Sequence, residues 1–243
     1  MQTLEFNTGA IKPIECVREA WELIKDEYWI LFGVSIVGAL IGGLSMYVLI
    51  GAMVCGIIGC YLKRIDGGHV IFEDLWLGFK FFWPSLLVTL AIVVPIVVFA
   101  VIMFVTIYLP IITAAVMGNK ANEGAILGTF LVGIVIDIIF AIVMVCIHSL
   151  LIFCFPLIVD RGMSSWDSMK LSARAVMKNL GGIGGLIAVN MGLVLLGELG
   201  FCIGLYLMIP IITAANVVAY RKVFPALKDH SFTPRSPIAS GGI

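Results

Sequence analysis

Charged residues are scarce in this chain, and their scarcity indicates its broad class before any motif is considered. Asp, Glu, Lys and Arg make up only 12% of the 243 residues, whereas charged residues are about a quarter of a typical soluble protein. Hydrophobic residues make up 61%, and the mean hydropathy is +1.14. This composition excludes an ordinary soluble protein, and we expect the lipid bilayer to be its main solvent.

The sequence also lacks the motifs that mark common enzyme and metal sites. It contains no H-E-x-x-H motif, no Walker loop and no G-x-S-x-G motif. None of its six cysteines forms a C-x-x-C pair, which argues against both a disulfide framework and a zinc site. We therefore expect a protein that is not an enzyme and that binds no cofactor and no metal.

The few basic residues are grouped, and the grouping predicts a topology. Fourteen of the fifteen Lys and Arg residues lie in four patches that flank long apolar stretches. The patches are Lys12, Arg18 and Lys25; Lys63, Arg64 and Lys80; Arg161, Lys170, Arg174 and Lys178; and Arg221, Lys222, Lys228 and Arg235. Because short loops rich in Lys and Arg stay in the cytoplasm during insertion, we predict an even number of crossings between patches. Both termini are then cytoplasmic, in the inner membrane of a bacterium.

Acidic residues share the basic loops, and the net charge is zero. A face of mixed sign is a poor match for a polyanion, so we expect no binding to nucleic acid. The N-terminal segment has no early apolar stretch, so a cleaved signal peptide is not indicated. The first spanning helix is then expected to act as its own insertion signal.

Four apolar stretches lie between the basic patches, and each is longer than one ordinary span. They cover residues 29–62, 81–118, 124–159 and 181–220. A bilayer core of about 30 Å needs only about 20 helical residues. We predict that the first and last stretches are helical hairpins, with turns near residues 42–45 and 197–200.

The two middle stretches allow two interpretations, because Lys120 between them is a single charge that leaves both topologies open. One kinked span each gives six spans in total, and a hairpin each gives eight. We favour six, since Pro95 and Pro110 can kink a long helix without turning it back. The predicted fold class is all-α, a polytopic transmembrane helical bundle. Residues 1–225 are expected to form one membrane-embedded domain, followed by a flexible polar tail over 226–243.

Three segments that precede apolar stretches have apolar residues at helical spacing. Their apolar faces contain Ile14, Val17, Trp21 and Ile24; Phe72, Leu75, Trp76 and Phe79; and Trp166, Met169, Ala173 and Met177. Aromatic residues opposite Lys or Arg suit the membrane interface. We predict three amphipathic interfacial helices on the cytoplasmic leaflet, anchored in membrane lipids by Trp21, Trp76 and Trp166.

One hexapeptide, Pro-Ile-Ile-Thr-Ala-Ala, occurs twice, at residues 110–115 and 210–215. Chance matches arise in apolar sequence of low complexity, but the order of interfacial helix and apolar hairpin recurs as well. Together the two observations indicate duplication of one unit.

Four polar residues within the apolar stretches form a possible intramembrane site. A charged side chain such as that of Asp137 costs free energy near the middle of the bilayer. His148 follows eleven residues later and lies on nearly the same helix face. The pair could form a proton or cation path, or Asp137 could only fix packing against a neighbouring helix. We interpret Asn190 as a residue that hydrogen-bonds between helices, and we place Glu198 at the outer interface.

Several loop motifs resemble those of a known family. The segments Lys63-Arg-Ile-Asp-Gly67, Phe72-Glu-Asp-Leu75, Phe155-Pro-Leu-Ile-Val-Asp-Arg-Gly162 and Ala219-Tyr-Arg-Lys222 carry the resemblance. They are similar to loops of a bacterial family of uncharacterised integral membrane proteins. That family is similar to the membrane domain attached to some glycerophosphoryl diester phosphodiesterases. The resemblance implies an all-helical membrane module that acts as an anchor or regulator, without the catalytic barrel of those enzymes.

These observations support two hypotheses about function. The first is a non-enzymatic inner-membrane protein that acts as a scaffold, anchor or regulator of a partner. That partner would be another membrane protein or a second copy of the chain. The alternative is a small transporter or channel with a proton or cation path through Asp137 and His148. A lipid-handling enzyme is a weaker third possibility, because the sequence contains no reactive cluster.

Overall fold

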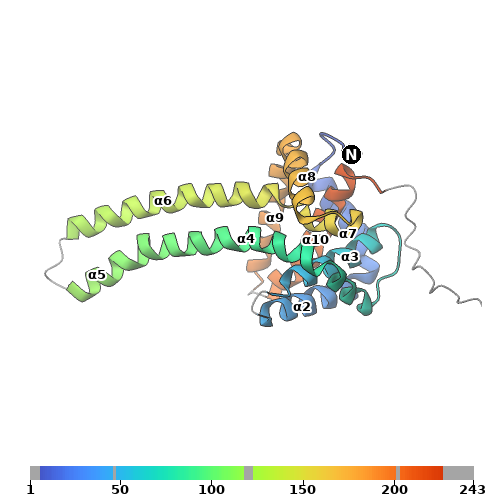
Figure 1. Ribbon diagram of the computed structural model, residues 1–243, viewed down its shortest axis with the longest axis horizontal. Helices are drawn as coiled ribbons and strands as arrows, with labels where there is room; N and C mark the ends of the chain where they lie inside the picture. The colour runs from blue at the N-terminus through green and yellow to red at the C-terminus, as the bar shows by residue number, and fades with distance from the viewer. Residues whose placement is uncertain (1–5, 46–47, 118–122, 201–202, 227–243) are drawn as a thin grey trace, which may run out of the picture.

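A computed structural model describes residues 6–45, 48–117, 123–200 and 203–226, and the regular elements within these ranges are helices (Figure 1). The elements are α1 (Pro13–Ile24), η1 (Lys25–Glu27), α2 (Tyr28–Leu44), α3 (Ile50–Ile65), η2 (Phe72–Phe81), α4 (Phe82–Met103), η3 (Phe104–Tyr108), α5 (Leu109–Met117), α6 (Glu123–Leu150), α7 (Cys154–Arg161), α8 (Ser165–Lys178), α9 (Leu180–Glu198) and α10 (Ile203–Val223). The predicted all-α class is confirmed. The predicted tail lies outside the described residues from position 227 onward.

Five of the described helical segments are long and apolar enough to cross a membrane. They are Pro13–Leu44, Phe72–Val116, Leu127–Arg161, Leu180–Glu198 and Ile203–Val223. The helix α3, with 16 residues, is shorter than these segments. The chain therefore has the helices of a multi-pass membrane protein.

The predicted hairpin turns agree with the structure. The first stretch ends one helix at Leu44 and begins the next at Ile50, and the last stretch is divided between Glu198 and Ile203. The second stretch is one continuous helical run through α4, η3 and α5. The third stretch forms the 28-residue helix α6 and then turns into α7. Each middle stretch thus contains one long helical run, as the six-span interpretation expects, while five of the described segments meet the length and composition of a membrane span.

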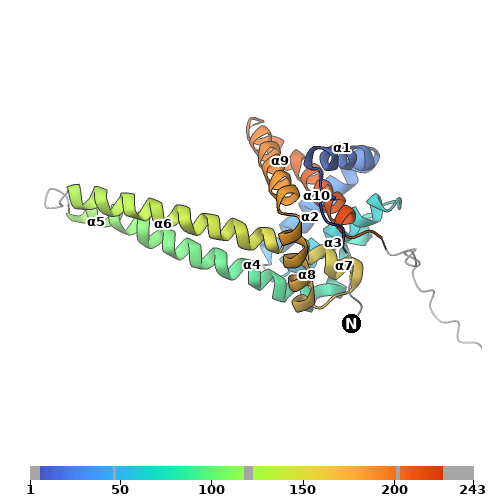
Figure 2. The ribbon, with the colours of Figure 1, turned by 90° about the horizontal axis from the view of Figure 1, so that it is seen from above.

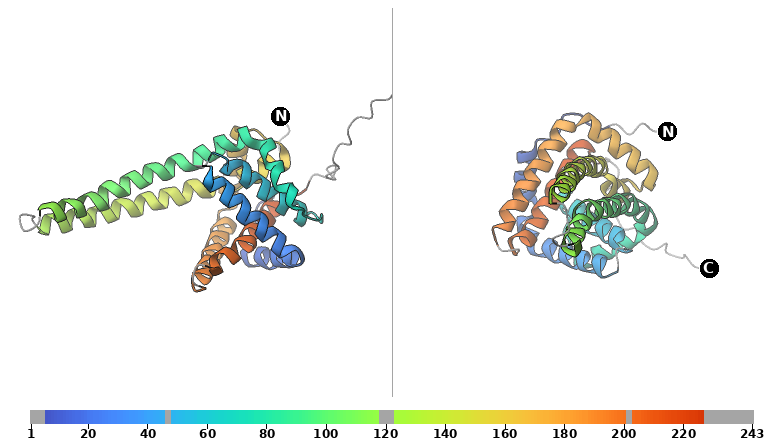
Figure 3. Two further views of the ribbon diagram at one scale, coloured as in Figure 1. Left: turned by 90° about the horizontal axis from the view of Figure 1, so that it is seen from below. Right: turned by 90° about the vertical axis from the view of Figure 1, so that its left-hand side faces the viewer.

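The molecule has two parts, which Figures 1 and 2 show clearly. The body comprises α1, α2, α3, η2 and α7 to α10. The long hairpin comprises α4, η3, α5 and α6, and it extends far beyond the body. Seen along the hairpin, helices of the body lie on several sides of its base (Figure 3). Body and hairpin are therefore joined only near that base.

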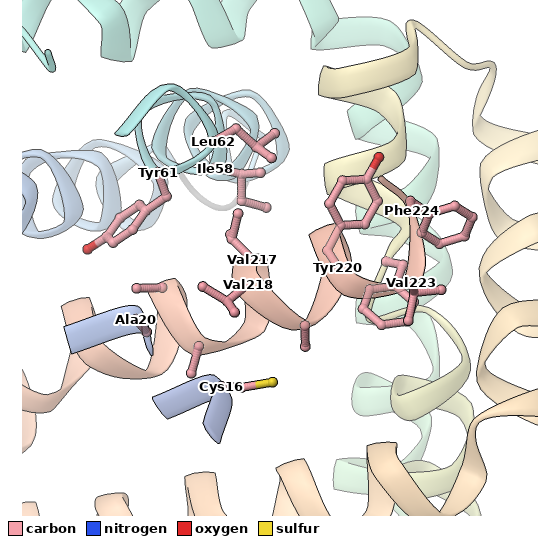
Figure 4. Packing of buried hydrophobic residues seen from close by; sticks show 14 of the residues in the cluster. Cys16, Ala20, Ile58, Tyr61, Leu62, Val217, Val218, Tyr220, Val223 and Phe224 are labelled. Carbon is pink, nitrogen blue, oxygen red and sulfur yellow. The ribbon is translucent and has the colours of Figure 1, made fainter. Parts of the chain in front are cut away.

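The helix α10 lies at the centre of the body and packs against α1, α2, α3 and α9. Figure 4 shows Cys16 and Ala20 of α1 on one side of α10, and Tyr61 of α3 on the other. Cys16, Ala20 and Ile24 follow each other at four-residue spacing and are fully buried. Because Cys16 and Ala20 are small, α1 can approach α10 closely.

The elements α3 and η2 approach each other closely at two glycines. A Cβ atom added to Gly78 would lie 2.1 Å from the carbonyl oxygen of Ala52, and one added to Gly56 would lie 2.1 Å from that of Leu75. Only glycine fits at these two positions, since no real side chain tolerates such distances. The second predicted interfacial helix is a 3-10 helix, so its residues repeat every three positions rather than at α-helical spacing.

The hairpin is far less covered than the body. Ser85, Val88 and Thr89 of α4 are buried at its base. Beyond them, large apolar side chains such as Val94, Val98 and Val101 are about half exposed. The run from α4 to α5 spans about 50 Å and α6 about 42 Å, at 1.5 Å per residue. The hairpin is thus much longer than the bilayer core of about 30 Å.

Candidate functional site

Asp137, the leading candidate from sequence, lies in the hairpin and bonds to the opposite helix. Its side chain comes from α6, and the residue is only 8% exposed. The Thr106 hydroxyl of η3 lies 2.9 Å from Oδ2 and 3.1 Å from Oδ1 of Asp137. The same hydroxyl lies 2.9 Å from the carbonyl oxygen of Ile102. Thr106 is therefore the side chain that meets the acid from the opposite helix, and its hydroxyl hydrogen is shared between Asp137 and the Ile102 carbonyl.

The local sequence explains why the helix is widened at this point. Pro110 has no N–H, so the carbonyl of Thr106 loses its donor four residues ahead. The chain forms the π-helical segment η3 immediately before this proline. Across the hairpin, a Cβ atom added to Gly133 would lie 2.7 Å from the Thr106 carbonyl oxygen. Gly133 and Asp137 are one turn apart on α6, so both contribute to a close contact around Thr106.

The contact of Thr106 with Asp137 is a hydrogen bond between the two arms of the hairpin. An interhelical hydrogen bond in a membrane typically contributes about 0.6 to 2 kcal/mol. A π-helical segment often marks a functional position, because it shifts a side chain out of the regular helical register. Here Thr106 lies within the π-helical segment and meets the acidic residue of the opposite helix.

His148 does not meet Asp137. The two residues lie three turns apart on α6, about 16 Å at the helical rise. The His148 Nδ1 atom lies 2.8 Å from the carbonyl oxygen of Met144 in the same helix. Its Nε2 atom is buried, and no hydrogen-bond partner for it occurs among the described residues. The proposed path through the two side chains therefore has no direct link in this structure.

Asn190 and Glu198 occupy different environments on α9. The Asn190 side-chain amide donates to Oδ1 of Asn216 on α10 at 2.9 Å, which confirms the predicted bond between helices. Glu198 is the last residue of α9 and is exposed beside the α9–α10 turn. The four candidates from sequence thus do not form one site.

A second polar cluster lies in the body and not in the hairpin that contains Asp137. We call it the base cluster. It consists of Asp66, Asp160, Arg161, Tyr220 and Arg221. Oδ2 of Asp160 accepts from the Tyr220 hydroxyl at 2.7 Å and from Nε of Arg161 at 2.9 Å. Nη1 of Arg221 lies 2.8 Å from the same oxygen, and its Nη2 and Nε bond Asp66 at 2.6 and 3.0 Å. The base cluster joins α7, α10 and the loop after α3.

Further ion pairs extend this polar face across the body. Lys63 bonds Asp74 at 2.8 Å, and Lys222 of α10 bonds Glu19 of α1 at 2.7 Å. Nε of Arg64 donates to the Leu23 carbonyl at 2.8 Å. The first contact links the consecutive elements α3 and η2, and the other two link segments that are far apart in the sequence. The charged loops are therefore held together on one side of the body.

The segment before α1 is also fixed to this face. The Gly9 amide donates to Oδ1 of Asn179 at 2.7 Å, and Nδ2 of Asn179 donates to the carbonyl oxygens of Asn7 and Ala175. The backbone N–H of Asn7 donates to the Val223 carbonyl oxygen at 2.9 Å. Asn179 therefore ties the N-terminal segment to the end of α8, and the Asn7 bond ties it to the end of α10.

The three predicted anchors are at least partly exposed. Trp21, Trp76 and Trp166 present between 43% and 64% of their surface. In α8 the buried face contains Ser165, Ser168 and Ser172, so the apolar face with Trp166 points outward. Ser164 caps the N-terminus of α8, since its hydroxyl accepts from the Asp167 backbone N–H. The faces predicted for α1 and η2 do not point outward as a whole, because Ile24 and Leu75 are fully buried.

The comparisons with known proteins do not assign a family. The chain matches no protein-family model, no curated protein and no solved structure. The described residues contain no group of three His, Cys, Asp or Glu side chains that could hold a metal. The helices define the chain as a multi-pass membrane protein, and the similarity to phosphodiesterase membrane domains stays an expectation.

Sequence reasoning identified Asp137 but missed its partner Thr106 and the entire base cluster. Pro110 was available as a signal for Thr106, because a proline frees the carbonyl four residues before it. Asp160 and Arg221 lie 61 positions apart, and a single sequence contains no signal that pairs them.

Proposed function

We propose that this protein is a non-enzymatic scaffold of the bacterial inner membrane, which anchors or regulates a membrane partner at its charged face. The observation that carries this proposal is the base cluster with its surrounding ion pairs. Together they hold the charged loops and the N-terminal segment in one arrangement. A surface fixed in this way is preorganised for binding, which lowers the ordering cost of association.

The orientation follows from the distribution of charge. Described members of the Lys and Arg patches, including Lys63, Arg161 and Arg221, lie on this face, and the positive-inside rule favours the cytoplasm for it. Both termini are then cytoplasmic. The exposed Trp21, Trp76 and Trp166 would hold α1, η2 and α8 in the headgroup region of the inner leaflet.

Purification in mild detergent tests the scaffold proposal. We expect the wild-type protein to be recovered as a stable homo-oligomer or in a complex with one membrane protein. Charge reversal of exposed residues of the charged face, Arg18→Glu with Arg174→Glu, should reduce the recovered assembly several-fold. The matched control is Val98→Leu on the hairpin, which should leave the assembly unchanged. A monodisperse monomer without a partner would contradict the proposal.

A second candidate function is a proton or cation transporter, and the pairing of Asp137 with a π-helical segment favours it. Its test is flux into liposomes that contain the purified protein. Asp137→Asn should abolish flux, whereas Glu73→Gln, which changes an exposed acid of the body, should not. Unchanged flux in Asp137→Asn would remove this candidate.

A further inference from the structure

The chain contains membrane helices of two different lengths. The helices α2, α9 and α10 have 17, 19 and 21 residues, and each spans about 25 to 32 Å. These lengths match a bilayer core of about 30 Å. The hairpin run from α4 to α5 spans about 50 Å and is apolar throughout. One bilayer cannot fit both sets of helices if they all stand upright.

The directions of the helices agree with this difference. In Figures 2 and 3, α2 and α9 run at a steep angle to the hairpin. When the short helices are close to the membrane normal, the hairpin is strongly inclined. A run of about 50 Å stays within a core of about 30 Å only at a tilt of about 50°. Membrane helices are tilted by about 20° on average, so this hairpin is unusual.

The surface of the hairpin indicates that lipid covers it. Exposed apolar side chains occur at consecutive positions, including Ile96, Val97 and Val98, and so they point to different sides of the helix. A protein partner would cover one stripe and leave the other sides polar. An apolar surface on several sides is typical of contact with acyl chains.

Near its base, the hairpin has a position at which its angle can change. Ser85 and Thr89 fix α4 against Gly51 of α3, where an added Cβ would lie 2.5 Å from the Thr89 hydroxyl. Pro95 follows within two turns, and α4 is exposed beyond it. Proline removes one helical hydrogen bond and allows the helix to bend at that point.

We propose that the hairpin is a lipid-contacting lever whose tilt against the body follows the thickness of the bilayer. A thicker bilayer allows the hairpin to stand more upright, and a thinner one forces it to incline further. The angle changes near Pro95, and α2, α9 and α10 keep their arrangement. This proposal requires only that the helices lie in lipid, so it holds or fails independently of the partner at the charged face.

Distance measurement between two spin labels tests the lever. One label replaces the exposed Val116 near the hairpin end, and the other replaces the exposed Leu199 after α9. Cys146, which is exposed, and Cys202 are first changed to alanine. The labelled protein is placed in phosphatidylcholine bilayers with short, medium and long acyl chains. For a core that thickens by about 10 Å, the distance should shorten by about 7 Å, as expected for a rod of this length.

A matched pair of labels controls for changes within the body. Labels at the exposed Leu44 and Leu199 report on the ends of α2 and α9. Their distance should stay constant while the Val116–Leu199 distance changes. Replacing Pro95 with alanine should reduce the change at Val116 by at least half. A Val116–Leu199 distance that is equal in all three bilayers, or a Val116 label that stays accessible to aqueous relaxation agents in all of them, would overturn the proposal.

Discussion

The same hexapeptide lies in the body and in the hairpin, and its two environments have little in common. In α10, residues 210–215 place Ala214 and Ala215 at 0% exposure inside the body. In α5, residues 110–115 leave Ile111 and Ile112 about half exposed near the end of the hairpin. The difference is that α1 and α2 pack against α10, whereas the main neighbours of α5 among the described residues are η3 and α6. Local sequence thus specifies a helix in both places, and the neighbouring elements specify whether it is buried.

The order of elements supports a repeated plan despite this difference. A short helix precedes two long helices three times, as α1 before α2 and α3, η2 before α4 and α6, and α8 before α9 and α10. The first and third units pack together through α1, α9 and α10. The middle unit forms the hairpin. We infer that packing within the body is tight and that packing in the hairpin tolerates change, and the following predictions test this contrast.

Replacing a glycine with alanine should lower the free energy of unfolding much more in the body than in the hairpin, and we expect this to be the largest difference between the two regions. Gly78→Ala would place a methyl group 2.1 Å from the Ala52 carbonyl oxygen, so η2 must move away from α3. We expect a loss of more than about 3 kcal/mol in the free energy of unfolding. Gly128→Ala in α6 is the control, since nothing lies within 4 Å of the added atom. It should be neutral or stabilising by about 0.5 to 1 kcal/mol. Reversible unfolding in bicelles measures both, and equal effects would contradict the contrast.

The repeated hexapeptide offers a second matched pair. Ala215→Leu adds a large side chain at a fully buried position of α10 and should destabilise the protein by about 2 to 3 kcal/mol. Ala115→Leu is the same change at the equivalent, exposed position of α5. It should alter stability by less than about 0.5 kcal/mol. Thermal unfolding of the two variants in one detergent is the measurement. A similar loss from Ala115→Leu would indicate that this end of the hairpin is covered by protein.

Most of the fold could be predicted from the sequence, because long apolar runs and glycine-rich breaks are local signals. The turns near Gly42 and Gly197 follow from such breaks. The 3-10 form of η2 could not be predicted, since the close contact of Gly78 with α3 is made by residues that are not neighbours in the sequence. The separation of hairpin and body was also not predictable. It depends on which helices pack together, and apolar composition alone does not specify partners.

The candidate site was only partly predictable, for a related reason. Asp137 is conspicuous because an acid is rare within an apolar stretch. Asp160 and Arg221 lie near the ends of such stretches, where charge is ordinary, and their importance appears only when α7 meets α10. His148 lies on the expected face of α6, yet its bond to the Met144 carbonyl shows that a shared face does not bring two side chains into contact.

Removing the charge of Asp160, the central acid of the base cluster, should cause the next largest loss in the free energy of unfolding. Asp160→Asn leaves Arg221, Arg161 and Tyr220 without their common acceptor charge. We expect a loss of about 2 kcal/mol, because each charged hydrogen bond contributes about 1.5 to 3 kcal/mol and Asn keeps one acceptor. The control, Asp26→Asn, removes an exposed acid whose ion pair to Arg64 contributes at most about 1 kcal/mol. Urea-dependent proteolysis near residue 161 reports the loosening, and identical cleavage of both variants would argue against a special role for the cluster.

The smallest effect is expected in the hairpin, where one hydrogen bond can be removed without altering the shape of a side chain. Thr106→Val takes the hydroxyl away from Asp137 and should cost about 1 kcal/mol, the range seen for such bonds in membranes. Thr113→Val is the control, because its hydroxyl bonds only the Leu109 carbonyl of its own helix among the contacts of the described residues. Steric trapping of the hairpin in bicelles can resolve a difference of this size. If Thr106→Val lowered the free energy of unfolding as much as Gly78→Ala does, the hairpin would depend on the Thr106–Asp137 hydrogen bond. Its packing would then be as intolerant of change as that of the body.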